Sequence, residues 1–103
     1  MLFVMKWDIH PDKAETYLKG TESAIKRTVS GPGVVEFRAY RGATGASQVV
    51  ITYEFADMPA WAAWYSNDDV QAVFDDVRNY TTGMTFELWG PSPIVPKPVP
   101  SFR

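Results

Sequence analysis

The sequence predicts one α+β domain with the element order βαββαβ, in which four strands form one antiparallel sheet and the helices cover one of its faces. Four short segments alternate apolar and polar residues, which is typical of half-buried strands. Two longer segments repeat apolar residues at helical spacing, and each lies between two of the strand segments. The length of 103 residues suits a single core.

The N-terminal part of the chain predicts a strand followed by a helix. Residues 2–9 alternate, which indicates the first strand. Pro11 suits a first helical turn, and apolar residues then recur at helical spacing, so we expect a helix over residues 11–29. The cluster Ser30-Gly31-Pro32-Gly33 ends this helix.

A hairpin follows the first helix. Residues 34–41 and residues 48–55 both alternate, which predicts the second and third strands. The run Gly42-Ala43-Thr44-Gly45 between them has the composition of a hairpin loop. We therefore expect these two strands to pair antiparallel.

The second helix is predicted to break between Tyr65 and Val70. Asp57 can cap its start, and Ser66 is a poor residue for a helix interior. The pattern Ser66-x-x-Asp69 resembles a capping box that restarts the helix, which then ends near residue 80. Residues 84–89 alternate again and predict the fourth strand.

The C-terminal segment is rich in proline. Proline lacks the amide hydrogen that helices and sheets require, so we expect a domain of residues 1–90 followed by an extended tail over residues 91–103. The PxxP spacing in this tail also suits grooves of the SH3 type. We favour an arm that packs on the domain or on its partner.

The two faces of the sheet are expected to differ. The helices would cover an apolar set, which is Phe3, Met5, Trp7, Phe37, Val49, Ile51, Tyr53, Phe55, Phe86 and Leu88. The opposite face mixes apolar and polar residues, which are Leu2, Val4, Lys6, Asp8, His10, Val34, Glu36, Arg38, Tyr40, Gln48, Val50, Thr52, Glu54, Thr85, Glu87 and Trp89. This face is either exposed to solvent in a monomer or pairs its charges across a dimer interface. The alternative is that it lines a polar cavity between two sheets.

An acid/base site would begin at His10, the only histidine, because imidazole is the side chain that titrates near neutrality. Asp8 lies two residues earlier on the same face and can orient the ring, and Tyr40 can donate a hydrogen bond. This constellation suits removal of a proton beside a carbonyl group. The alternative is that His10 only marks the turn into the helix.

The candidate ligand-binding residues lie mostly on the same face. Lys6 and Arg38 can hold an anionic oxygen, and Glu54 and Trp89 share their face. Trp64, on the second helix, could line an apolar pocket, although aromatic residues at this spacing also form cores. One histidine and no cysteine provide no recognisable metal-ligand spacing, so we expect no metal and no cofactor.

Composition argues against several partner classes. A net charge of −2 and a pI near 5.2 are unlike the basic surface of nucleic-acid-binding domains. No apolar run approaches the length needed to span a bilayer, so we expect no membrane insertion. The absence of cysteine fits a reducing compartment, and we expect a cytoplasmic protein.

Two segments carry a resemblance to a known superfamily. The order βαββαβ is that of ferredoxin-like domains. The stretch from Tyr53 through Asp57, Trp61 and Trp64 to Ser66 resembles the strand, acidic cap and tryptophan-bearing helix of the dimeric α/β-barrel superfamily, which includes antibiotic-biosynthesis-monooxygenase-like proteins. The turn Pro32-Gly33 is similar to the one that enters their second strand.

The resemblance implies a homodimer whose two sheets close around a cavity. It implies a small-molecule-binding protein, with cofactor-independent monooxygenase or isomerase activity on an aromatic or carbonyl compound as one interpretation. A non-catalytic dimeric ligand-binding or interaction module is the alternative. None of the matched motifs is itself catalytic.

Overall fold

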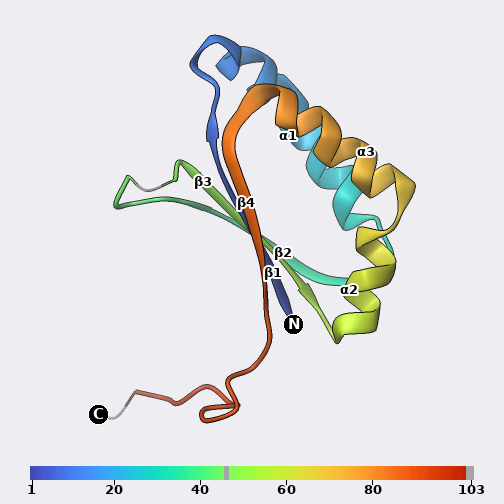
Figure 1. Ribbon diagram of the computed structural model, residues 1–103, viewed down its shortest axis with the longest axis vertical. Helices are drawn as coiled ribbons and strands as arrows, with labels where there is room; N and C mark the ends of the chain where they lie inside the picture. Colours follow the sequence, from blue (N-terminus) through green and yellow to red (C-terminus); the bar gives the residue numbers. More distant parts are fainter. Residues whose placement is uncertain (46, 102–103) are drawn as a thin grey trace.

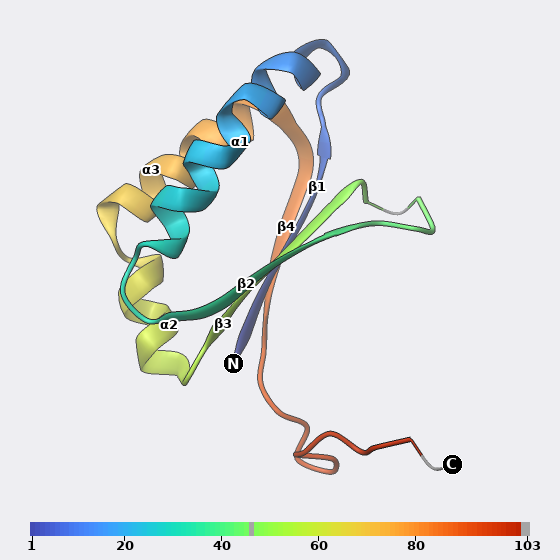
Figure 2. The same ribbon diagram turned by 180° about the vertical axis from the view of Figure 1, so that it is seen from behind.

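The computed structural model describes residues 1–45 and 47–101. One four-stranded antiparallel sheet, in the order β2-β3-β1-β4, carries the helices on one face and leaves the other face open (Figures 1 and 2). This ferredoxin-like topology confirms the predicted fold class. The elements are β1 (Leu2–Ile9), η1 (Pro11–Lys13), α1 (Ala14–Val29), β2 (Val34–Arg41), β3 (Val49–Phe55), α2 (Met58–Tyr65), α3 (Asp68–Val77), η2 (Arg78–Tyr80) and β4 (Thr81–Trp89).

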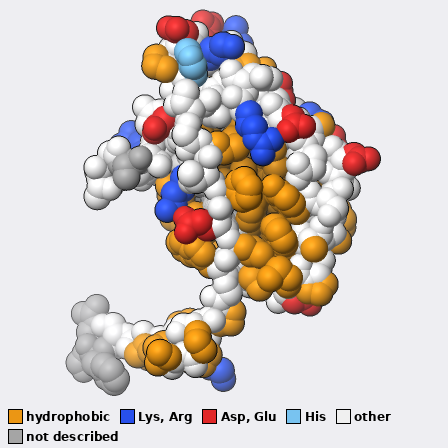
Figure 3. Space-filling view, in the orientation of Figure 1, with side chains coloured by type: hydrophobic (Ala, Val, Ile, Leu, Met, Phe, Trp, Pro, Cys, Tyr) orange, Lys and Arg blue, Asp and Glu red, His pale blue; other side chains and the backbone are white. Residues whose placement is uncertain are grey.

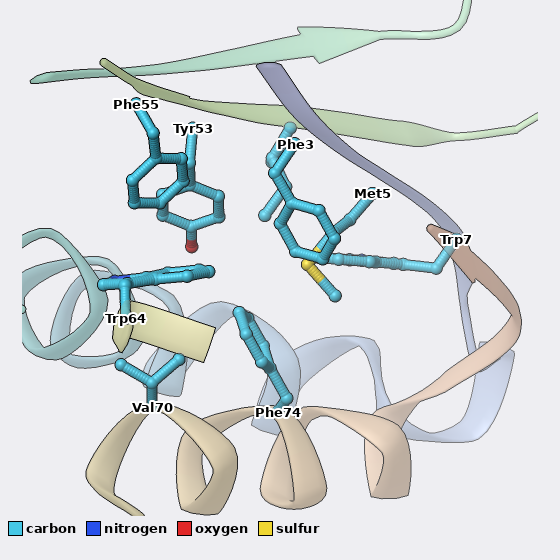
Figure 4. Close-up of a cluster of buried hydrophobic side chains, with 9 residues drawn as sticks. Phe3, Met5, Trp7, Tyr53, Phe55, Trp64, Val70 and Phe74 are labelled. Atoms are coloured by element: carbon cyan, nitrogen blue, oxygen red, sulfur yellow. The ribbon is translucent and has the colours of Figure 1, made fainter. Parts of the chain in front are cut away.

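The core lies between the helices and the sheet, and it is largely aromatic (Figure 4). Trp64 on α2 is fully buried, and its ring centroid lies 4.7 Å from that of Tyr53 and 5.0 Å from that of Phe55. Its Nε1 donates to the carbonyl oxygen of Thr28 at 2.8 Å, and the Tyr53 hydroxyl donates to Thr28 Oγ1 at 2.9 Å. Burial raises the pKa of Tyr53 to about 12. The Trp64 indole and the Tyr53 hydroxyl are therefore hydrogen-bonded, as buried polar groups usually are, whereas Trp61 Nε1 is buried without a partner among the described residues.

The predicted helix break is confirmed, although its cap differs from the prediction. The helix ends at Tyr65 and restarts at Asp68. Asn67, rather than Ser66, is the N-cap of α3, because its Oδ1 accepts hydrogen bonds from the backbone N–H groups of Asp69 and Val70. The Ser66 hydroxyl instead donates to the carbonyl oxygen of Ala62 and closes α2.

An ion pair joins the two long helices at the surface. Arg27 Nη2 on α1 donates to Asp69 Oδ1 on α3 at 2.5 Å. The hydrogen bond from Arg27 lowers the pKa of Asp69 below its ordinary value. Both side chains are about half exposed, so the pair adds little stability but joins α1 to the start of α3.

The end of the sheet near η2 departs from simple alternation. β4 begins at Thr81 rather than at residue 84, because Gly83, with a φ of 64°, interrupts the pattern without ending the strand. The β1–β4 register shifts between Lys6 and Asp8, which marks a bulge. Smaller differences are that residues 11–13 form a 3₁₀ turn and that β3 begins at Val49.

A second irregularity corrects the predicted faces of β2. The β2–β3 register shifts between Val34 and Glu36. Val34 therefore packs against the core instead of lying on the open face, and Val35 is 62% exposed. Phe86 is also less covered than predicted, at 49% exposed, because β4 is an edge strand that the helices cover only in part.

Beyond β4 the tail runs away from the helices toward the side of the open sheet face (Figures 1 and 2). In the described part of the tail, up to residue 101, no helix or strand forms, and Ile94 and Val99 are largely exposed. This extended form fits the proline content. Of the helices that the structure describes, none is both long and apolar enough to cross a lipid bilayer.

Candidate functional site

The open face of the sheet is hollowed into a groove of about 430 Å³. Side chains from all four strands line it, and they alternate with the core residues of the same strands as a two-residue period requires. The lining residues are Leu2, Val4, Lys6, Glu36, Arg38, Tyr40, Val50, Thr52, Glu54 and Trp89. The groove is thus lined by apolar and charged side chains together.

Its charges are partly paired within the chain. Lys6 Nζ lies 3.4 Å from Glu87 Oε2, and Arg38 Nε donates to Glu36 Oε1. The hydrogen bond to Glu36 raises the pKa of Arg38. Glu54 stands directly opposite Glu36 in the β2–β3 register, so two like charges face each other on this side of the sheet.

The structure brings together five of the eight side chains that the sequence singled out. Lys6, Arg38, Tyr40, Glu54 and Trp89 all line the open-face groove. Tyr40 and Trp89 are each about half exposed there. The alternation of the strands was sufficient to find this group, because each residue sits at a position of the correct parity.

His10 and Asp8 do not join them. His10 Nδ1 accepts a hydrogen bond from the backbone N–H of Asp12 at 3.2 Å, and so it caps η1. Asp8 Oδ1 accepts from the backbone N–H of Gln48 at 2.8 Å. His10 follows the last residue of β1 and serves as the N-cap of η1, so it does not line the groove beside Lys6 and Arg38.

Trp64 does not line the groove either. It is fully buried in the core, and its indole N–H is committed to the carbonyl oxygen of Thr28. The structure therefore places it with the core residues, which is the alternative that the sequence left open.

A second hollow, of about 120 Å³, lies on the opposite side of the sheet, beneath α1 and α3. Its lining is almost entirely apolar and comes from both helices and from β1, β2 and β3; the lining residues are Trp7, Tyr17, Gly20, Thr21, Ala24, Ile25, Phe37, Ala39, Val49, Ile51, Tyr53, Val73, Phe74, Asp76, Val77 and Tyr80. We call it the helix–sheet cavity.

The helix–sheet cavity was missed at the sequence level. Gly20 and Ala24 lie on the same face of α1, and Ala39 approaches from β2, so small residues from distant segments leave the space unfilled. A glycine inside a helix costs about 1 kcal/mol relative to alanine. A glycine inside the predicted first helix, Gly20, was therefore the sequence signal that could have indicated the cavity. In the structure nothing lies within 4 Å of the position that its Cβ would take.

Two hydrogen bonds place polar groups on the wall of this cavity. The Nε1 of Trp7 donates to the Tyr17 hydroxyl oxygen at 3.2 Å. The Tyr80 hydroxyl donates to Asp76 Oδ1 at 3.1 Å, and this bond raises the pKa of Tyr80. An apolar cavity with a few such groups is the usual form of a small-molecule site.

A third surface feature is an aromatic patch beside β4. Figure 3 shows apolar side chains gathered between β4 and the helices. Phe86 lies there, with ring centroids 5.9 Å from Phe3 and 6.1 Å from Tyr65. Phe3, Tyr65 and Phe86 line neither the groove nor the helix–sheet cavity. Among residues 1–45 and 47–101, no three His, Cys, Asp or Glu side chains gather in a way that could hold a metal ion.

A family model agrees with this architecture. The model described as antibiotic biosynthesis monooxygenase matches residues 1–76, which include every strand except β4. No curated protein matches the chain significantly.

Solved structures share the fold at low sequence identity. A DABB family protein with a ferredoxin-like fold from Mesorhizobium loti is 18% identical over 88% of this chain and 95% of its own, with a TM-score of 0.77. A structure described as an antibiotic biosynthesis monooxygenase is 17% identical over 90% of this chain and all of its own, with a TM-score of 0.71. SnoaB from Streptomyces nogalater, described as a cofactor-independent oxygenase, is 15% identical over 89% and 94%, with a TM-score of 0.67. At these identities the likeness establishes the fold alone.

Proposed function

This chain belongs to the antibiotic biosynthesis monooxygenase family, and from that premise we propose that it binds a small aromatic molecule in the helix–sheet cavity and oxidises it with molecular oxygen. The observation that carries the proposal is the cavity itself, which lies between the helices and the sheet, is lined almost entirely by apolar atoms, and has hydroxyl groups on its wall. Isomerisation of a carbonyl compound is the related activity that the sequence left open.

The cavity volume indicates the size of the ligand. An apolar cavity of about 150 Å³ in another protein binds benzene. At about 120 Å³, the helix–sheet cavity suits a single aromatic ring. A larger ring system would require α1 and α3 to separate.

The chemistry can proceed without a bound electron carrier when the substrate is itself electron-rich. One hydroquinone and one O₂ give one hydroxyquinone and one water, so the substrate supplies the electrons that reduce the second oxygen atom. In this reaction the protein would bind the ring, orient its reacting oxygen and limit access of water. Those are the tasks to which an apolar cavity with few polar groups is suited.

A pair of substitutions at Gly20 tests the site. Gly20→Ala and Gly20→Leu both remove a helix glycine, so each is expected to raise the free energy of unfolding by up to about 1 kcal/mol. Only the leucine fills the cavity. Binding of hydroquinone or toluene can be measured from changes in amide chemical shifts. We expect it to weaken more than about tenfold in Gly20→Leu and to persist in Gly20→Ala. Oxygen consumption with hydroquinone should follow the same pattern.

The results separate binding from catalysis. Loss of binding in Gly20→Leu with no oxygen consumption in any variant would support the non-catalytic alternative, a ligand-binding module. Equal binding by both variants would overturn the assignment of the site to the helix–sheet cavity.

We also propose that a second copy of the chain covers the open face of the sheet, as in a dimeric α/β barrel. Leu2 and Val50 line this face among its charges, and burying them would reduce exposed apolar area in a domain with a small core. Glu54 faces Glu36 within one chain, and Arg38 of a second copy would relieve that repulsion.

Sedimentation is the measurement for this proposal. The wild-type protein is expected to sediment as a dimer at micromolar concentration. Val50 is paired with Lys6 in the β1–β3 register, so Val50→Arg would place one additional cation beside Lys6 in each of the two subunits. The repulsion between these like charges is expected to weaken the dimer more than about tenfold. Leu18→Arg, at a 69% exposed position on α1, is the matched control and should leave the dimer intact. A monomeric wild-type protein would contradict the proposal.

A second candidate site is the groove that the dimer would enclose, in which Lys6 and Arg38 would hold an anionic ligand oxygen. Its volume of about 430 Å³ and its cationic side chains favour an aromatic carboxylate. Benzoate distinguishes the two sites. Shifts that vanish in Arg38→Ala and persist in Gly20→Leu would assign it to the groove, and the reverse would assign it to the helix–sheet cavity.

A further inference from the structure

We infer that Tyr17 binds the oxygen atom of a phenol held in the helix–sheet cavity and stabilises that oxygen as an anion. This role rests on the proposed function and makes it more specific, since it names the substrate class and the side chain that touches the reacting oxygen.

The hydrogen bond from Trp7 leaves Tyr17 as a free donor. Trp7 on β1 is 5% exposed, and its indole Nε1 can only donate. It donates to the Tyr17 hydroxyl oxygen at 3.2 Å, so the proton of that hydroxyl must point elsewhere. Within the described residues, the Tyr17 hydroxyl donates to no protein acceptor. Because Tyr17 lines the cavity, a ligand oxygen there would be an available acceptor.

Tyr80 provides an internal contrast in the same cavity. Its hydroxyl proton is already committed, because it donates to Asp76 Oδ1 at 3.1 Å. The hydrogen bond to Asp76 also raises the pKa of Tyr80, which is the expected effect of a carboxylate acceptor. Of these two tyrosines on the cavity wall, therefore, Tyr17 has the hydroxyl that is free to donate.

The hydrogen bond from Trp7 makes the Tyr17 hydroxyl a stronger donor. A hydroxyl that accepts a hydrogen bond from an indole becomes a better donor itself, because successive hydrogen bonds polarise one another. The wall around it is apolar, so its interaction with a negative oxygen would be stronger than in water. A donor held in place before the reaction is the arrangement by which proteins stabilise a developing oxyanion.

The step itself is a simple ionisation. The O–H bond of the phenol breaks, its proton passes to water at the exposed rim near Asp76, and the oxygen keeps the electron pair. Tyr17 keeps its own proton and donates it as a hydrogen bond to the phenolate. The phenolate is then the electron-rich species that reduces O₂, the co-reactant of the proposed reaction.

The ionisation of bound 4-nitrophenol tests the role without relying on turnover, because its anion absorbs visible light. In Tyr17→Phe the pKa of the bound phenol is expected to rise by about one unit, which corresponds to about tenfold weaker binding of the anion. Tyr80→Phe is the matched control, and it should leave that pKa unchanged. Toluene, which has no oxygen, should bind the wild-type protein and Tyr17→Phe equally.

Each outcome bears on one claim. If 4-nitrophenol and toluene bind the cavity but Tyr17→Phe leaves the pKa of the bound phenol unchanged, the role of Tyr17 is wrong and the proposed function stands. A shift of that pKa in Tyr80→Phe instead would also overturn it. If neither ligand binds the wild-type protein, or if Gly20→Leu binds both as well as Gly20→Ala does, the proposed function fails first.

Discussion

Trp64→Ala is expected to lower the free energy of unfolding by about 3–5 kcal/mol, the range for removing a large buried aromatic side chain. Trp64 is fully buried, and its ring packs against Tyr53 and Phe55. The substitution would leave a cavity and would remove the donor that satisfies the Thr28 carbonyl oxygen. Because small domains are stable by only about 5–15 kcal/mol, a large part of the protein should be unfolded at modest urea concentration.

Urea denaturation, monitored by circular dichroism, measures this loss of stability, and two variants serve as comparisons. Trp64→Phe keeps an aromatic ring but loses the indole N–H, so we expect an intermediate loss. Trp89→Ala removes a tryptophan that is 47% exposed in the groove, and its effect is expected to stay within about 0.5 kcal/mol. A loss at Trp64 as small as that at Trp89 would mean that the core does not depend on this ring.

Gly31→Ala is expected to cost about 1–3 kcal/mol, although it changes one hydrogen atom to a methyl group. A Cβ at Gly31 would lie 2.6 Å from Trp64 Cδ1 and 2.9 Å from Trp64 Nε1. The indole cannot easily retreat, because its N–H is bonded to the Thr28 carbonyl oxygen and its ring faces the aromatic core. The steric overlap therefore has to be relieved by moving the turn or the core.

A double substitution tests that explanation. If the cost comes from contact with the indole, Gly31→Ala should be less destabilising in a Trp64→Phe background than alone, because the smaller ring leaves room for the methyl group. Gly20→Ala, at a glycine with open space around it, is the control and should not destabilise. Additive effects of Gly31→Ala and Trp64→Phe would show that the turn, and not the indole, is responsible.

The residues of the open-face groove could be predicted because strand parity is a local property. Lys6, Arg38 and Glu54 each follow a two-residue period within one strand, and the period alone places them on one face. The helix break was predictable for a similar reason, because Ser66 and Asn67 hydrogen-bond to nearby backbone wherever they occur. In both cases the determining contacts lie within a few residues along the chain.

The position of His10, the displacement of Val34 and the helix–sheet cavity were decided by the tertiary structure. Val34 departs from parity because β2 carries one extra residue relative to β3 between Val34 and Glu36, and that fit depends on the pairing of the two strands. His10 leaves the sheet because β1 ends at Ile9 and the chain turns into η1, where the backbone N–H of His10 donates to the carbonyl oxygen of Tyr80. The cavity exists because folding brings Gly20 and Ala24 of α1 and Ala39 of β2, all small residues, to the lining of one space. Composition and periodicity thus determined the elements and the polar face, whereas the space left between packed elements depends on the sum of side-chain volumes brought together only by folding.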